Sequence, residues 1–463
     1  MKILKCFFTF AAIALCLGFS SCSNDDDGPS YSETSIVNAR LKAILTGKGY
    51  TFDGNGNLLL DDKAVNTTSL DLSDTKVDTA ALKELSVFPN LKELNLSHNG
   101  YGPGFNFALL PSKINSVDLS NNKIFEYPGL VNIVTAENGD ETVTVQRNLS
   151  KLVLPQSAQY NCVEIPTYFA HKDASAEVEM QDSLGNVKAY TTLRDVPCEA
   201  TRAYLKDVFP SLFVGNQIDV SKRLVKLTEA NASIDLERGS IPKSSSTKNI
   251  TSVEGVEYVA MNPGFQGATI YIDLKKKCTL VYLKTNRKLG VLSLSNINTP
   301  LLDVSNSNKL CYILLEKNDS IRSLNLSHCT LMGTRSMLQE TSIDLPSGIL
   351  VLDCPSFEKI SISKAVKNLG SLSLEELPNL KKLDLSMLSY IQECYITEIP
   401  NCNVTMYNFS KPSDWTVQPF FDISEDVYKQ SSVKEFLDKY HSNLKSSGWT
   451  EYGKTYDWTV NYK

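Results

Sequence analysis

The chain has 463 residues, of which 42% are hydrophobic and 21% are charged, and its net charge is −6. This composition excludes a wholly disordered chain, a collagen-like fibre and a small disulfide scaffold. It also argues against a nucleic-acid partner, because such proteins present dense Lys/Arg patches and none stands out in this sequence.

The first 22 residues have the pattern of an export signal. Residues 1–5 carry two lysines, residues 6–19 are almost entirely apolar, and Ser20 and Ser21 precede Cys22. An apolar segment of about 14 residues is too short to cross a membrane and is typical of a cleaved secretory signal. The residues alone leave open whether Cys22 has a function or stands there by chance.

Residues 19–22 (FSSC) resemble the lipobox of bacterial lipoproteins, with Phe19 where leucine is more usual. This resemblance implies that Cys22 is lipidated and becomes the mature N-terminus. Residues 23–27 (SNDDD) resemble the acidic export tag of surface lipoproteins of the Bacteroidetes type, and a solvated spacer is the alternative interpretation. Together the resemblances imply an outer-membrane protein that a lipid anchor holds on the cell surface.

Three segments near the N-terminus repeat with spacings of 24 and 23 residues: SLDLS at 69–73, LNLS at 94–97 and VDLS at 117–120. Apolar and polar residues alternate in them, which predicts short strands with one buried face. Asn99 and Asn122 follow two of these strands, where a buried amide can bond to backbone groups of adjacent turns of the chain. The longer units at 91–99 and 114–122 match LxxLxLxxN and resemble the leucine-rich-repeat signature.

The C-terminal half repeats more closely. The pattern LxxLxL, with Ile, Val, Phe or Cys allowed at the apolar positions, begins at residues 289, 310, 321, 349, 357, 369, 380 and 391. Several of these starts are 11 or 12 residues apart, about half of one leucine-rich repeat. We therefore expect each coil of about 22 residues to carry strands on both sides, with few helices.

Three cysteines occupy key positions of these repeats. Cys329 stands in the Asn position, and Cys354 and Cys394 stand where inward leucines are expected. We predict that all three are buried, inert thiols. The disulfide state is left open for Cys162, Cys198, Cys394 and Cys402.

The remaining segments are less regular. We predict helices at 35–45, 78–88 and 431–444, a turn at 53–57, a hairpin around 182–186 and a linker at 243–248. Residues 205–221 share features with residues 85–97, which favours degenerate repeats in the middle of the chain. A small inserted domain at 160–200 is the alternative.

The predicted fold is an α/β solenoid of leucine-rich repeats with parallel strands. It has irregular or helix-poor coils in the C-terminal half and non-repeat caps at both ends, because each end of a solenoid exposes an apolar layer. In chain order we predict a lipoprotein signal peptide (1–21), an acidic tether (22–33), an N-terminal cap (34–65), leucine-rich repeats (66–154), degenerate repeats or an inserted segment (155–250), leucine-rich repeats (251–404) and a C-terminal cap (405–463).

The sequence lacks the common signatures of catalysis. GxGxxG, P-loop, HExxH and GxSxG motifs are absent, and four histidines leave little material for zinc or imidazole chemistry. The carboxylates of Glu375 and Glu376 are more typical of a solvated surface than of a glycosidase. We predict a non-enzymatic chain with no catalytic residue, cofactor or metal. An enzyme with its site in 155–250 and a structural envelope protein are the alternatives.

The leucine-rich-repeat resemblance implies a binding scaffold, on which outward strand residues contact a protein ligand. The candidate contact residues are Lys92, Glu93, Asn95, Asn115, Ser116, Asp118, Arg322, Ser323, Asn325, Lys381, Lys382 and Asp384. The alternative is a glycan-binding or nutrient-capture lipoprotein, in which Trp415, Trp449 and Trp458 stack against sugar rings.

Overall fold

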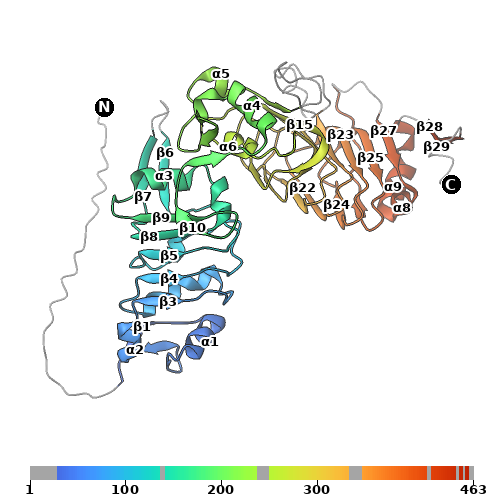
Figure 1. The fold of residues 1–463 in the computed structure, drawn as a ribbon. Helices are drawn as coiled ribbons and strands as arrows, with labels where there is room; N and C mark the ends of the chain where they lie inside the picture. The colour runs from blue at the N-terminus through green and yellow to red at the C-terminus, as the bar shows by residue number, and fades with distance from the viewer. Residues whose placement is uncertain are drawn as a thin grey trace, which may run out of the picture. The chain divides into compact units, whose positions relative to one another are not determined.

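The computed structural model shows an α/β fold with many parallel strands and few helices (Figure 1). It describes residues 29–135, 141–236, 250–332, 347–413, 419–444, 448–451 and 454–457. The predicted signal peptide, Cys22, the acidic run and the linker at 243–248 lie outside these residues. The chain divides into two compact units, Met1–Thr67 with Glu84–Asn90, and Thr68–Lys83 with Leu91–Lys463.

The first unit combines a small antiparallel sheet with short helices. Its elements are β1 (Tyr31–Ser35), α1 (Ala39–Gly47), β2 (Asn57–Leu59) and α2 (Asp62–Asn66). The predicted helix at 35–45 is wrong at its start, because Ser35 ends β1 and Asn38 caps α1 by accepting the N–H of Leu41 at 2.9 Å. The turn at 53–57 is confirmed, and Asp53 closes it by accepting two backbone N–H groups.

A six-stranded sheet opens the second unit. Its strand order is β10-β9-β8-β5-β4-β3, and every pair except β10–β9 is parallel. The strands are β3 (Ser69–Asp71), β4 (Glu93–Asn95), β5 (Ser116–Asp118), β8 (Lys151–Leu154), β9 (Glu177–Gln181) and β10 (Val187–Ala189). The three repeated segments and the hairpin around 182–186 are therefore confirmed. The helix predicted at 78–88 is a 3₁₀ helix, η1 (Thr79–Val87).

Buried asparagines join the turns that follow these strands, as predicted. The amide nitrogen of Asn99 donates to the carbonyls of Leu72 and Leu96, both at 2.9 Å. That of Asn122 donates to Leu96 at 3.0 Å and Leu119 at 2.8 Å. Each amide thus satisfies carbonyl groups of two successive strand segments, which fixes the spacing between them.

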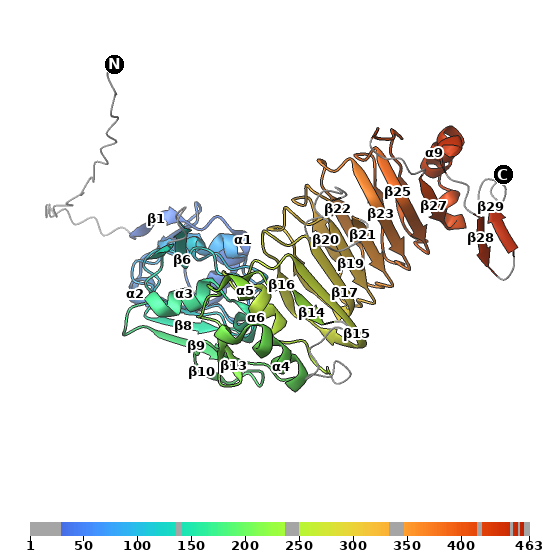
Figure 2. The ribbon, with the colours of Figure 1, turned by 90° about the horizontal axis from the view of Figure 1, so that it is seen from above.

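The C-terminal half alternates between two sets of parallel strands (Figure 2). An eight-stranded sheet contains β14 (Ile234–Leu236), β15 (Thr269–Thr279), β17 (Val291–Asn298), β19 (Tyr312–Glu316), β21 (Gly348–Leu352), β23 (Asn368–Glu375), β25 (Tyr390–Thr397) and β27 (Phe420–Ile423). The intervening strands are β16 (Tyr282–Lys284) and β18 (Leu301–Asp303), which pair together, and β20 (Ser323–Leu326), β22 (Lys359–Ile362), β24 (Lys382–Asp384) and β26 (Asn403–Thr405). From β15 to β27, consecutive strands therefore lie in different sheets, as the half-repeat spacing predicted.

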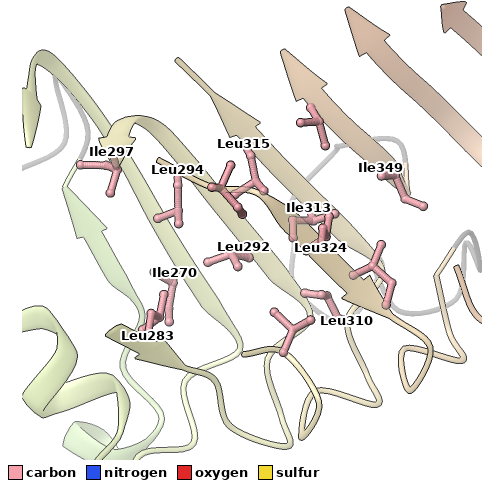
Figure 3. Close-up of a cluster of buried hydrophobic side chains, with 14 of the residues drawn as sticks. Ile270, Leu283, Leu292, Leu294, Ile297, Leu310, Ile313, Leu315, Leu324 and Ile349 are labelled. Atoms are coloured by element: carbon pink, nitrogen blue, oxygen red, sulfur yellow. The ribbon is translucent and has the colours of Figure 1, made fainter. Parts of the chain in front are cut away.

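Each LxxLxL start leads into a strand, but one copy is out of register. Ile349 pairs with Ile313 and Val351 with Leu315, so the copy at 349 is shifted by three residues relative to the one at 310. Strands of the eight-stranded sheet and the intervening strands contribute apolar side chains to one shared core, part of which Figure 3 shows. Leu292 of β17 and Leu324 of β20 are two of its members, both at most 1% exposed.

The middle of the chain departs from the parallel arrangement. The segment at 218–221 was interpreted as part of a further repeat, but β13 (Gln217–Asp219) pairs antiparallel with β11 (Leu193–Asp195) and β12 (Phe213–Val214). The interpretation is wrong because Gly215 and Asn216 close a two-residue hairpin, and Gly215 has a φ of 60°. The other elements here are β6 (Val131–Thr135), β7 (Glu141–Val145), η2 (Phe107–Leu109), η3 (Gln156–Tyr160), α3 (Glu164–His171), α4 (Glu199–Val208), η4 (Pro210–Leu212), α5 (Leu227–Ala230) and α6 (Val256–Ala260).

The cysteines within the described residues are all buried, and none forms a disulfide. This confirms the buried positions of Cys329, Cys354 and Cys394, each 0% exposed. Burial raises the pKa of the Cys329 and Cys354 thiols to about 12, so both stay protonated at neutral pH.

The C-terminal segment covers one sheet edge. Its described elements are α8 (Glu425–Tyr428), α9 (Ser431–Tyr440), η6 (His441–Asn443), β28 (Gly448–Glu451) and β29 (Lys454–Asp457). Gln430 accepts the N–H of Val404 at 2.8 Å and donates to the carbonyl of Cys402 at 2.8 Å, which satisfies one N–H of β26 and the carbonyl directly before it. Trp415 and Trp458 lie outside the described residues, and of Trp449 only the backbone, in β28, is described.

Candidate ligand-binding surface

Six of the predicted contact residues lie on one sheet of the C-terminal half. They are Arg322, Ser323, Asn325, Lys381, Lys382 and Asp384, which lie on or directly before β20 and β24. Strand β22 lies between these two strands and adds residues that the sequence analysis did not select. The register of the strands places four side chains in one outward row. In this row Ser323 pairs with Lys359, Lys359 with Lys382, and Lys382 with Asn403.

Two lysines therefore stand directly opposite each other on neighbouring strands. Adjacent strands are about 4.8 Å apart, and like charges at opposed positions destabilise a sheet. Lys382 reaches Asp384 at only 3.9 Å, and Lys359 and Lys381 make no ion pair with any described residue. Arg322 adds a further cation, which contacts Glu358 at 3.1 Å. The surface concentrates positive charge in a chain whose overall charge is negative.

A shallow groove of about 490 Å³ lies over these strands. Its charged lining comprises Glu358, Lys359, Lys381, Lys382 and Asp384. Its apolar lining includes Ile360 and Met387, which are only partly buried and pack against the core. The groove thus offers exposed apolar surface bordered by cations, and this combination suits a ligand with both apolar and acidic groups.

Four of the twelve predicted contact residues have a structural role that the sequence analysis missed. Asn95, Asp118, Asn325 and Asp384 each accept the backbone N–H of the serine two positions later, at 2.8–3.1 Å. Hydrogen bonds from both the hydroxyl and the N–H of Ser386 lower the pKa of Asp384. Such local bonds end each strand in a turn. The recurring Asp/Asn-Leu-Ser triplet was the signal that could have revealed this role.

The other six predicted residues lie on or before β4 and β5 of the first sheet. They are Lys92, Glu93, Asn95, Asn115, Ser116 and Asp118. Here Glu93 pairs in register with Ser116, and Ser116 with Lys151. Lys151 is neutralised by Glu177 at 3.6 Å and Glu179 at 3.0 Å. The structure thus places the two predicted sets on different sheets, one acidic and one basic.

Lys359 and its strand could have been selected from the sequence. The pattern that begins at residue 357 predicts β22 and places Lys359 and Ser361 outward. What the sequence does not give is the register that brings Lys359 opposite Lys382, because strand pairing is not a local property.

No protein-family model matches the chain, and no curated protein matches it. In the described part of the chain, no helix has the length and apolar character needed to cross a membrane. The same residues contain no group of three or more His, Cys, Asp or Glu side chains placed to hold a metal ion. The fold and the surface therefore define an α/β protein of parallel strands that carries a lysine-lined groove.

Proposed function

We propose that the chain is a non-enzymatic, lipid-anchored cell-surface protein that binds a protein ligand through a leucine-rich-repeat solenoid. The LxxLxL periodicity, the parallel pairing of successive strands and the bonds of Asn99 and Asn122 support the solenoid. The contacts of Gln430 with β26 support a C-terminal cap. The sequence around Cys22 supports the lipid anchor and the outer-membrane location.

The proposal of a binding site rests on Lys359 of β22 and Lys382 of β24, which stand opposite each other. A like-charge pair lowers the stability of the sheet. Local destabilisation of this kind at the surface is typical of a functional site. The occupant we propose is an acidic segment of another protein, because its carboxylates complement Arg322, Lys359, Lys381 and Lys382. Partly exposed Ile360 and Met387 would contact the apolar side chains of that segment.

The test is a binding screen of the mature chain, residues 22–463, against extracellular and envelope proteins. A ligand is then compared between the native chain and the double variant Lys359→Glu/Lys382→Glu. The matched control is Lys275→Glu/Lys276→Glu, which makes the same charge change at two exposed neighbours on β15. We expect the first variant to weaken binding at least about tenfold and the control to change it less than about twofold. Equal losses in both variants would contradict the proposed site.

Glycan binding through the tryptophans stays an alternative prediction. Its test is the variant Trp415→Ala in a glycan-binding assay of the mature chain. A sugar ligand that is lost in this variant, and that still binds Lys359→Glu/Lys382→Glu, would replace the proposed function.

A further inference from the structure

A second candidate site lies in the second unit, lined by residues distinct from those of the lysine-lined groove. It is a cavity of about 750 Å³, within the range typical of small-ligand sites. Its lining residues come from four chain segments at 125–126, 160–164, 260–266 and 282–288, together with Arg223 and Asn306. We propose that this cavity binds an acidic saccharide, and this proposal does not depend on the proposed function.

The basic side chains of the lining favour an acidic ligand. Among the lining side chains, Arg223, Lys284, Arg287 and Lys288 are basic, and Glu126 and Glu164 are acidic. Arg223 contacts Glu141, and Lys284 contacts Glu126 and Asp303. Arg287 and Lys288 are exposed and make no ion pair with any described residue. These two cations are available to a ligand, and an arginine binds a carboxylate through two parallel hydrogen bonds.

Contacts among Phe125, Glu126, Tyr282 and Lys284 fix the shape of one wall of the cavity. The hydroxyl of Tyr282 donates to Glu126 Oε1 at 2.7 Å, and Lys284 contacts the same carboxylate. The rings of Phe125 and Tyr282 have centroids 4.8 Å apart. The Tyr282–Glu126 bond joins residues 156 positions apart in the chain. The protein's own contacts thus form this wall without a ligand.

Polar side chains are accessible in the lining of the cavity, beside the two cations. Phe125, Tyr160 and Tyr282 are at most 6% exposed, so their rings give a ligand little apolar surface. Gln266 and Asn306 are exposed and make no side-chain hydrogen bond within the described chain. Free amides beside free cations suit a ligand that is rich in hydroxyl groups and carries a carboxylate.

The test measures binding to the mature chain by titration calorimetry with three probes. These are a trisaccharide of galacturonic acid, the neutral trisaccharide of galactose, and inorganic phosphate. We expect the galacturonate trisaccharide to bind at least about tenfold more tightly than the other two probes. The variant Arg287→Glu/Lys288→Glu should weaken this binding at least about tenfold, and the control Lys275→Glu/Lys276→Glu less than about twofold.

A further variant tests the saccharide part of the proposal. Asn306→Ala should weaken binding of galacturonate trisaccharide and leave the weak binding of phosphate unchanged. Absence of galacturonate binding to the native chain, equal losses in both charge variants, or equal affinity for phosphate would each overturn the proposal. Lys359→Glu/Lys382→Glu should leave galacturonate binding unchanged, so failure at this cavity is distinguishable from failure at the groove.

Discussion

The side-chain carbonyl of Asn122 accepts the backbone N–H of Asn99 at 3.1 Å, while the amide nitrogen of Asn122 donates to Leu96 at 3.0 Å. Asn122 also accepts the N–H of Tyr101 at 3.0 Å. One buried amide therefore satisfies backbone groups of two successive turns, which explains why asparagine recurs at this position of the repeat. Leaving such groups unsatisfied in a buried site is costly.

The variant Asn122→Ala should therefore be strongly destabilised. We expect a loss of at least about 2 kcal/mol in the free energy of unfolding, because several buried backbone groups lose their partner. Urea denaturation followed by circular dichroism measures it. The control is Lys123→Ala, at an exposed neighbour, which should change stability by less than about 0.5 kcal/mol. Similar small effects in both variants would argue against a structural role for the asparagines.

The opposed lysines lead to a second prediction. Lys359→Thr should raise the free energy of unfolding by about 0.2–1 kcal/mol, because it removes a like-charge contact with Lys382. The gain should shrink as salt screens the repulsion. Denaturation at low and high salt gives both values, with Lys275→Thr as the control. A native chain that is more stable than Lys359→Thr at low salt would mean that the two ammonium groups do not repel each other.

Glu257 leads to a third prediction, on the pH dependence of stability. The side chain is 0% exposed, and Gly255 donates its N–H to Oε2 at 3.0 Å. Burial, with a smaller contribution from the nearby Glu254, raises the pKa of Glu257 from 4.5 to about 8. The folded state therefore holds a proton between these two values that the unfolded state has released. Stability should fall by about 1.4 kcal/mol per pH unit as the pH rises from 4.5 to about 8.

The variant Glu257→Gln isolates this contribution. It should be more stable than the native chain at pH 8, and the difference should diminish as the pH falls toward 5. Thermal unfolding across that pH range provides the comparison. Parallel pH profiles for the two proteins would show that Glu257 does not carry a raised pKa.

The covered sheet edge leads to a fourth prediction. Gln430→Ala should lose about 1–3 kcal/mol of stability, because the N–H of Val404 and the carbonyl of Cys402 lose their partner. It should also promote self-association, since an open edge strand pairs with other chains. Sedimentation velocity detects the association, with Lys434→Ala on the exposed face of α9 as the control. A monomeric variant of native stability would show that this contact does not protect the edge.

Much of the strand pattern was predictable because alternating leucines indicate directly which face of a strand is buried. The segment from Leu369 to Leu374, for example, predicts β23 in its observed register. Strands β16 and β18 were missed because each has a single pair of apolar residues around Leu283 or Leu302, which is too short for the pattern. The antiparallel sheet in the middle depends on the turn at Gly215, whose effect on pairing a repeat search does not detect.

The candidate site was predicted less well than the fold. The sequence indicates that Lys382 and Ser323 point outward, but it does not reveal the register that places Lys359 between them. The cavity near Arg287 was not predicted, because its lining residues come from four segments that only the tertiary structure brings together.

The most direct test of the central claim is lysine footprinting of the mature chain with its protein ligand. Acetylation of each lysine is measured by mass spectrometry with and without the bound ligand. The account predicts that the ligand protects Lys359, Lys381 and Lys382 and leaves Lys275 and Lys276 as reactive as in the isolated chain. Protection of Lys275 and Lys276, with Lys359 and Lys382 still reactive, would contradict it.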